Sequence, residues 1–167
     1  MKKTLIGLIM LAAAAAVPVF ASQEMERKVR HELIMLPYYG VFDNLTFQMN
    51  DGVVTLAGQV TRPALRSDAE NVVKRIEGVE RVVNNIGVLP LSSFDDSIRL
   101  RALRSIYGST ALSRYGWVPN SPVRIIVKHG QMILEGVVAN ENDKNVAFLK
   151  ANGVSGTFKV TNNLRVE

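Results

Sequence analysis

The sequence predicts an α+β protein made of two tandem copies of a small αββαβ domain, each a three-stranded mixed sheet packed against two helices. Three observations lead to this prediction. The chain repeats itself at a spacing of 78 residues. Each copy contains stretches of helical and of strand periodicity in the same order. Turn signals containing glycine separate these stretches at equivalent places.

The repeat is an ungapped match between residues 52–89 and 130–167, with identity at 10 of 38 aligned positions. Glycine and valine dominate the identical positions, which therefore mark turns and core positions. Each copy, at about 75 residues, is long enough to form a small domain with its own core. The identical pairs are Gly52/Gly130, Leu56/Leu134, Gly58/Gly136, Val60/Val138, Ala69/Ala147, Gly78/Gly156, Val82/Val160, Asn84/Asn162, Asn85/Asn163 and Val88/Val166.

The N-terminus predicts an export signal. Two lysines precede an uncharged apolar run of 16 residues (5–20), which is shorter and richer in alanine than the ~20 apolar residues that span a bilayer. Small residues at the positions that a signal peptidase reads predict cleavage after Ala21, and a retained membrane anchor is the alternative. We therefore expect a signal peptide over 1–21, a first domain over 22–92 and a second domain over 93–167.

The composition excludes several kinds of chemistry. The sequence contains no cysteine, which rules out disulfides, thiol catalysis, thiolate metal sites and a lipid-modified N-terminal cysteine. Without the two signal lysines, Lys and Arg fall from 20 to 18 against 15 acidic residues, a net charge of +3. An export signal without disulfides predicts a soluble bacterial protein that is periplasmic or secreted, not a lipoprotein.

The first half of the first copy predicts a helix and a β-hairpin. Apolar residues at helical spacing indicate a helix over 24–36, which Pro37 ends. Alternating apolar residues indicate strands at 45–49 and 54–60. Asp51-Gly52 between them is a strong signal for a tight hairpin turn.

The second half predicts another helix and a third strand. Helical spacing indicates a helix over 65–76, with Thr61 as N-cap and Pro63 in the first turn. Gly78 can take the left-handed C′ position that ends this helix. Alternation then indicates a strand over 82–88.

Gly58 interrupts the apolar face of the second strand. It shares that face with Leu56 and Val60, and a missing side chain there allows close approach of another backbone. We expect this backbone to be that of the second helix, whose Ala69 suits such an approach.

The second copy predicts the same order of elements. A linker over 89–96 joins the copies, and its shortness brings the domains close together. The predicted elements are a helix over 95–112, strands over 124–128 and 132–138, a helix over 141–151 and a strand over 159–166.

These motifs resemble the BON domain, a family named from bacterial osmotically inducible and nodulation proteins. The resemblance rests on "GVVTLAGQV" (52–60) with "GVERVVNNIGV" (78–88), and on "GQMILEGVV" (130–138) with "GTFKVTNNLRV" (156–166). The second copy departs from the pattern at Thr157, where the family motif has valine. A signal peptide followed by two such domains is similar to the family's periplasmic osmotic-stress proteins.

The resemblance implies a non-enzymatic αββαβ module that binds phospholipid surfaces and supports the cell envelope under stress. In a lipoprotein relative, the first helix of the second domain contacts anionic phospholipid. This sequence departs from that relative because it has no cysteine to carry a lipid.

The residues offer no recognisable catalytic or metal site. His31 and His129 lie at non-equivalent places and have no second ligand at a usable spacing. The sequence has no nucleophile elbow, phosphate-binding glycine loop or paired carboxylates on one helix face. We therefore expect no enzymatic activity, no cofactor and no metal. The repeated Asn84 and Asn162 have two interpretations, a polar contact in a ligand groove or an amide that satisfies nearby backbone groups.

Basic and aromatic residues gather in the second domain. It carries 10 basic and 6 acidic residues, against 8 and 9 in the first. Arginines with nearby tyrosine and tryptophan suit a membrane interface, where cations meet anionic headgroups. We predict lipid-binding residues there, and ordinary core packing with a solvated basic face is the alternative. Nucleic acid is not expected as a partner of an exported chain of modest charge. The predicted lipid-binding residues are Arg99, Arg101, Arg104, Tyr107, Arg114 and Trp117.

A loop in the first domain offers a rival binding surface. Tyr38, Tyr39 and Phe42 follow the first helix in a segment interrupted by glycine. Such a loop could bind another envelope protein, which would make the chain an adaptor or chaperone-like module, or it could close a small core. Binding to lipid through arginines weakens as salt rises, whereas an aromatic protein interface does not weaken much.

Overall fold

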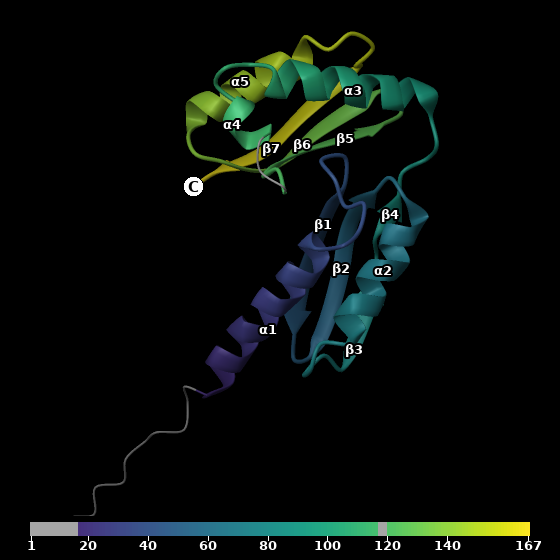
Figure 1. Ribbon diagram of the computed structural model, residues 1–167, viewed down its shortest axis with the longest axis vertical. Coiled ribbons are helices and arrows are strands. Elements are labelled where there is room, and N and C mark those ends of the chain that lie inside the picture. Colours follow the sequence, from purple (N-terminus) through teal and green to yellow (C-terminus); the bar gives the residue numbers. More distant parts are fainter. Residues whose placement is uncertain (1–16, 117–119) are drawn as a thin grey trace, which may run out of the picture.

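The computed structural model describes residues 17–116 and 120–167, and it contains two units that each have helices on one face of a sheet (Figure 1). The predicted signal peptide (1–21) falls mostly outside these residues. Within the described ranges, no helix combines the length and apolar character needed to cross a membrane.

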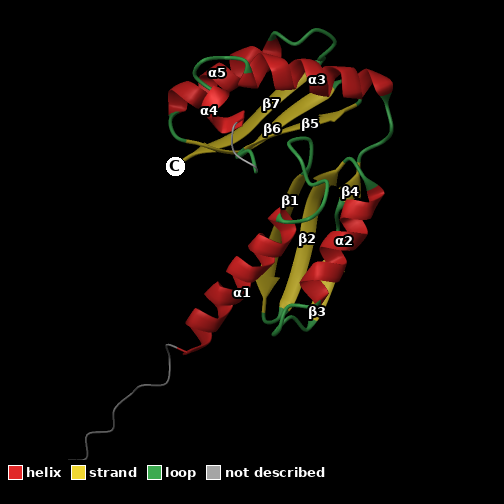
Figure 2. Cartoon of the chain, in the orientation of Figure 1, coloured by secondary structure: helices red, strands yellow, loops and turns green. Residues whose placement is uncertain are grey.

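The first unit has the predicted order of helix, strand, strand, helix and strand. α1 and α2 cover one face of its sheet (Figure 2). Its elements are α1 (Val17–Ile34), β1 (Asn44–Asn50), β2 (Val53–Val60), α2 (Pro63–Lys74), β3 (Arg81–Asn84) and β4 (Gly87–Val88).

The second unit repeats this order, with a short additional helix. α3 and α5 lie on the face of the sheet that points away from the first unit (Figure 2). Its elements are α3 (Ser93–Tyr107), α4 (Ser113–Gly116), β5 (Val123–Lys128), β6 (Gln131–Val138), α5 (Glu141–Asn152) and β7 (Lys159–Val166).

Each sheet is mixed, as predicted. β1 pairs with β2 and β5 with β6 in antiparallel fashion, whereas β3, β4 and β7 lie parallel to the central strand of their sheet. Both hairpins turn through two residues with positive φ, at 45° and 75° for Asp51-Gly52 and 51° and 71° for His129-Gly130. This is the geometry of a type I′ turn, which matches the twist of the strands that it joins.

Each unit has its own core. Val29 and Leu33 of α1 pack with Val54 and Leu56 of β2 in the first. The second core is formed by the equivalent surfaces of α3, α5 and the sheet. The predicted fold of two αββαβ domains is therefore confirmed.

Three elements differ in extent from the prediction. The helix expected over 24–36 is α1, which begins at Val17 and ends at Ile34. The expected strand over 82–88 is divided into β3 and β4, and Gly87 stands where the second copy has Arg165. Glycine in a strand has no side chain to pack and weakens pairing. The helix expected over 95–112 ends at Tyr107, because Gly108 forms its C-cap and a turn follows.

The cap predictions for α2 were wrong in part. Pro63 lies in the first turn as expected, but the N-cap is Arg62, and no side chain caps the helix there. The Thr61 hydroxyl donates instead to Asp43 Oδ1, at 2.8 Å. Gly78 does have a positive φ of 91°, but it lies beyond the C-cap residue, Arg75.

Gly58 is required for a different reason from the one predicted. It has a φ of 108°, and an added Cβ would lie 2.0 Å from the carbonyl oxygen of Asn44. The close neighbour is thus strand β1 rather than a helix. Gly136 repeats the arrangement against the carbonyl oxygen of Pro122, at 1.8 Å.

The repeated asparagines join each third strand to its second helix. Asn84 Nδ2 donates to the carbonyl oxygen of Arg66, at 2.9 Å, and Asn162 Nδ2 to that of Lys144, at 3.1 Å. The Oδ1 atom of each accepts from the backbone N–H two residues later. Of the two interpretations, the structure supports an amide that satisfies backbone groups.

These contacts predict that Asn162 contributes more to stability than its neighbour Asn163 does. Asn162→Ala should lower the free energy of unfolding by about 1–3 kcal/mol, because two backbone groups lose their partner. Asn163→Ala, its matched control, removes an exposed side chain bonded only to Glu135, and should change stability by less than about 0.5 kcal/mol. Urea denaturation of both variants measures the difference, and equal effects would contradict the assignment.

Candidate functional site

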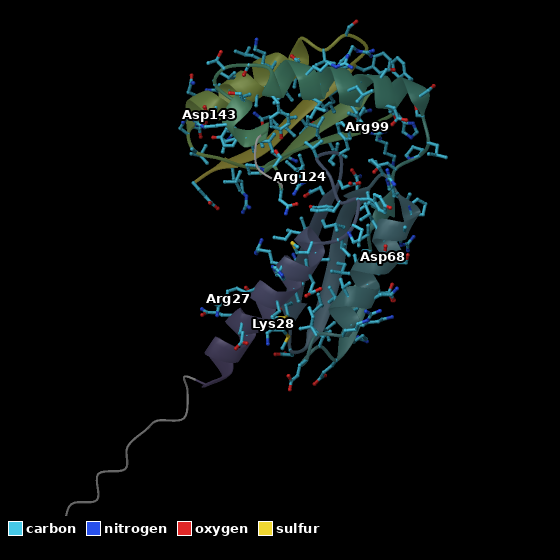
Figure 3. The ribbon with its side chains drawn as sticks, viewed as in Figure 1. Arg27, Lys28, Asp68, Arg99, Arg124 and Asp143 are labelled. Atoms are coloured by element: carbon cyan, nitrogen blue, oxygen red, sulfur yellow. The ribbon has the colours of Figure 1, made fainter. Side chains whose placement is uncertain are left out.

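Arg99, one of the predicted lipid-binding residues, is directed into the second domain. Its side chain is only 5% exposed, and its Nη2 donates to the carbonyl oxygen of Val127, at 2.6 Å (Figure 3). Its Nη1 pairs with Asp96. Arg99 therefore joins α3 to β5 and offers little charge to a surface ligand.

Arg114 pairs with a buried carboxylate. Its Nη2 contacts Asp143 Oδ2, and the Tyr115 hydroxyl donates to the same oxygen, at 2.5 Å. The side chain of Asp143 is 4% exposed, whereas that of Arg114 is 54% exposed. The hydrogen bond to Tyr115, with the nearby Asp143 charge, raises the pKa of Arg114. Arg114 thus connects α4 to the start of α5.

Tyr107 closes the end of α3 against the sheet. Its hydroxyl donates to the carbonyl oxygen of Val123, at 2.6 Å, and contacts Ser121 Oγ. Burial raises the pKa of this phenol, and the hydrogen bond to Ser121 opposes the shift. Trp117 lies outside the described residues.

Arg101 and Arg104 of α3 are the predicted arginines that form no ion pair with a carboxylate among the described residues. Arg101 Nε donates to the carbonyl oxygen of Ser155, at 3.1 Å. Arg104 is exposed, and in the described part of the chain no carboxylate pairs with it. The five predicted residues that the structure describes thus do not form one surface, and Arg101 and Arg104 alone among their arginines have no carboxylate partner there.

Two phenylalanines outside the predicted set form an exposed stacked pair. The Phe94 and Phe158 rings lie 6.1 Å apart, with 46% and 77% of these residues exposed. An added Cβ on Gly130 would lie 2.5 Å from the Phe158 ring. Contiguous exposed apolar surface is a candidate binding surface.

One arginine lies beside this pair. The Arg101 guanidinium and the Phe94 ring both lie beside Gly156. Lys128 and Lys159 lie near the same turn but on the other face of the sheet, because their neighbours Val127 and Val160 pack in the core under the helices. We call the set of Phe94, Phe158 and Arg101 the aromatic–basic patch.

A comparison of the two copies could have revealed this patch. Phe158 occupies the position of Glu80 in the first copy, so an acidic residue is replaced by an aromatic one at equivalent turns. Phe94 fell within the predicted linker, where periodicity gives no indication of its surroundings.

The predicted partner-binding loop contacts the second domain of its own chain. The carbonyl oxygen of Val41 accepts from Ile125 N, at 2.8 Å, and that of Gly40 from Arg124 Nη1, at 3.0 Å. The Arg124 guanidinium lies 4.5 Å from the centre of the Tyr39 ring. Because β5 is an edge strand, this loop covers part of its free edge.

The aromatic residues of the loop differ in their exposure to solvent. Phe42 is half-buried against the second core, whereas Tyr38 is 73% exposed with a φ of 67°. The buried Asp43 carboxylate holds the loop by accepting from Gly40 N, at 2.9 Å, and Thr61 N, at 2.6 Å. Of the three predicted residues, Tyr38 alone is largely open to solvent.

A hollow of about 250 Å³ lies between α1 and the edge of β1. Apolar and polar side chains share its wall about equally, and two arginines from different domains lie beside it. Its lining residues are Arg30, Leu33, Ile34, Tyr39, Leu45, Thr46, Phe47 and Arg165. The described residues contain no group of three or more histidine, aspartate or glutamate side chains suited to a metal.

The fold is that of a tandem α+β protein built from two copies of one module. The sequence matches the BON domain family over residues 22–90 and 109–167, so the chain belongs to this family. The second match begins after α3, which places Phe94 and Arg101 outside it. BON domains are generally binding modules without catalytic activity, and they are typical of periplasmic or membrane-associated stress proteins.

The comparisons with curated proteins and with solved structures do not bear on function. No curated protein matches the chain. Two solved structures of CdsD, a structural protein of the type III secretion system of Chlamydia trachomatis, are similar at 13% and 14% identity. The matches cover 86% and 84% of this chain and 92% and 96% of those chains, with TM-scores of 0.30 and 0.31. Likeness at this level supports no functional conclusion.

Proposed function

We propose that this chain is a non-enzymatic periplasmic protein of envelope or osmotic stress, whose second domain binds anionic phospholipid surfaces peripherally. The observation that carries the proposal is the aromatic–basic patch, in which an exposed pair of phenylalanine rings lies beside the Arg101 guanidinium. Aromatic rings insert at the boundary between headgroups and acyl chains, and Lys and Arg bind anionic headgroups.

The expected binding is weak and reversible. Each cation near an anionic surface contributes about 1 kcal/mol, and the contribution falls within a Debye length. Each ring adds at most about 1.5–3 kcal/mol, since part of its surface is already covered by the other. Affinity should therefore fall as salt is raised, and it should depend on both kinds of residue.

Co-sedimentation with vesicles tests the proposal. The exported protein should bind vesicles that contain phosphatidylglycerol and not vesicles of phosphatidylcholine alone. Phe94→Ala/Phe158→Ala should reduce binding about tenfold or more, through loss of ring burial. Arg101→Ser/Arg104→Ser should reduce binding and flatten its salt dependence.

Arg66→Ser/Arg81→Ser is a matched control, because it removes two exposed arginines from the first domain. This control should bind as the wild type does. Absence of binding to either vesicle would overturn the proposal, and equal losses in control and patch variants would remove the assignment to the patch.

An adaptor function is the second candidate. It is favoured by the hollow between α1 and β1, which Tyr39 of the predicted loop lines together with apolar side chains and two arginines. Vesicle binding that is absent, or that does not respond to the patch variants, would favour this candidate.

A further inference from the structure

The hollow between α1 and β1 follows the edge of a strand rather than one face of the sheet. Side chains of successive strand residues point to opposite faces. Leu45 and Phe47 pack against the core on the helix side, and Thr46 between them is exposed. Because all three residues line the hollow, it must lie along the free edge of β1.

The backbone of that edge has unpaired groups. In the described residues β1 pairs only with β2. A two-residue hairpin makes Asn50 and Val53 a hydrogen-bonded pair, so every second residue of β1 directs its N–H and C=O away from β2. Leu45, Phe47 and Met49 are these residues, and Leu45 N indeed donates to the Tyr39 hydroxyl, at 3.2 Å. The backbone groups of Phe47 therefore face the hollow, and no partner for them is found among residues 17–116 and 120–167.

The charge at the hollow is positive. Arg30 comes from α1 and lies 5.5 Å from the centre of the Phe47 ring, and Arg165 comes from β7 of the second domain. Neither pairs with a carboxylate among the described residues, and no acidic residue lines the hollow. Two free guanidinium groups beside apolar walls complement a carboxylate next to an apolar side chain.

We propose that this hollow binds an extended acidic peptide segment of another envelope protein, which adds to the sheet as a strand along β1. Backbone hydrogen bonds to Phe47 hold the segment in register. Its inward side chains are apolar and pack between Leu33 and Phe47, and a carboxylate lies between Arg30 and Arg165. A free strand edge favours a peptide over a lipid, because an acyl chain leaves the edge groups unpaired.

This inference deepens the adaptor function and does not depend on membrane binding. The probe is a phage-displayed library of random ten-residue peptides, selected on the exported wild-type protein and counter-selected on Arg30→Gln/Arg165→Gln. Selected peptides should alternate apolar residues and carry Asp, Glu or a terminal carboxylate. Synthetic versions should bind the double variant about tenfold or more weakly, as expected for lost charge-assisted contacts.

Three controls distinguish the possible outcomes. Arg66→Gln/Arg81→Gln should leave peptide affinity unchanged, and so should the phenylalanine variants of the aromatic–basic patch. Peptide binding should slow hydrogen exchange at the Phe47 and Met49 amides, and methylation of alternate peptide nitrogens should abolish binding. Matching thermal unfolding of the variants shows that they remain folded.

Several results would overturn the inference. These are a selection that yields no acidic peptides, peptides that bind the double variant as tightly as wild type, or bound peptides that leave the β1 amides unprotected. If a short-chain anionic phospholipid protects the groove residues where selected peptides do not, the hollow is a lipid site instead. Loss of vesicle binding in the patch variants with intact peptide binding would separate the two surfaces.

Discussion

Gly136→Ala is expected to destabilise the second domain more than any other single methyl group added to it. The added Cβ would lie 1.8 Å from the carbonyl oxygen of Pro122, and the residue has a φ of 115°. Unfavourable backbone geometry costs about 1–3 kcal/mol and overpacking about 1–3 kcal/mol, so we expect a loss of about 2–6 kcal/mol. This is a large part of the 5–15 kcal/mol that is typical of a domain.

Thermal and urea denaturation of residues 22–167 measure this loss. Gly153→Ala is the control, because Gly153 has a helical φ of −77° and the nearest atoms to its added Cβ lie at 3.7 Å. That variant should change stability by less than about 0.5 kcal/mol. A Gly136→Ala protein that unfolds like the control would show that β5 and β6 are not held this closely. Gly58→Ala should have the same effect on the first domain, against Asn44.

These glycines show how far the sequence alone could predict the fold. Their spacing of 78 residues predicted equivalent positions, and the strands around them were predicted within one or two residues. The reason for these glycines was not predictable. A missing side chain indicates that another backbone segment lies close, but it does not show which segment this is. The neighbour proved to be the adjacent strand, whose carbonyl oxygen lies where a Cβ would be.

The candidate site was harder to predict, because the use of a charged side chain depends on tertiary contacts. Arg99 precedes Ala102 by three residues and Ile106 by seven, and therefore lies on the same helical face as these buried residues. That spacing could have identified it as buried, but its partner, the carbonyl oxygen of Val127, lies 28 residues away. Phe158 belongs to no periodic apolar pattern. Its unusual character is indicated only by the alignment of the two copies, in which it replaces Glu80.

Asp95 is the polar residue whose loss we expect to cost most in the second domain. Its side chain is fully buried, and its two carboxylate oxygens accept from His129 N, at 2.9 Å, and Gly130 N, at 2.8 Å. It thereby joins the first turn of α3 to the β5–β6 hairpin. Its negative charge also lies near the N-terminal end of that helix, where the helix dipole stabilises an anion.

Asp95→Ala should lower the free energy of unfolding by about 2–5 kcal/mol, because two backbone donors lose their acceptor and a cavity remains. Asp95→Asn should recover part of this loss, because the amide keeps one acceptor oxygen and places an N–H group against the other donor. Asp68→Ala on α2 is the matched control, since no ion pair or hydrogen bond to the Asp68 carboxylate is found in the described residues, and it should stay within about 0.5 kcal/mol of wild type. Urea denaturation followed by circular dichroism gives all three values.

The same substitution connects stability with the proposed membrane surface. Phe94 adjoins Asp95 in sequence, and Phe158 packs over Gly130, which Asp95 holds. At temperatures where Asp95→Ala remains folded, the hairpin should exchange its Gly130 amide faster, and binding to phosphatidylglycerol vesicles should fall even though no residue of the patch is changed. If stability falls while vesicle binding is unaltered, vesicle binding by the patch does not require Asp95 to hold the β5–β6 hairpin in place. If neither changes relative to Asp68→Ala, the two carboxylate hydrogen bonds contribute nothing net, and packing of α3 alone positions the aromatic pair.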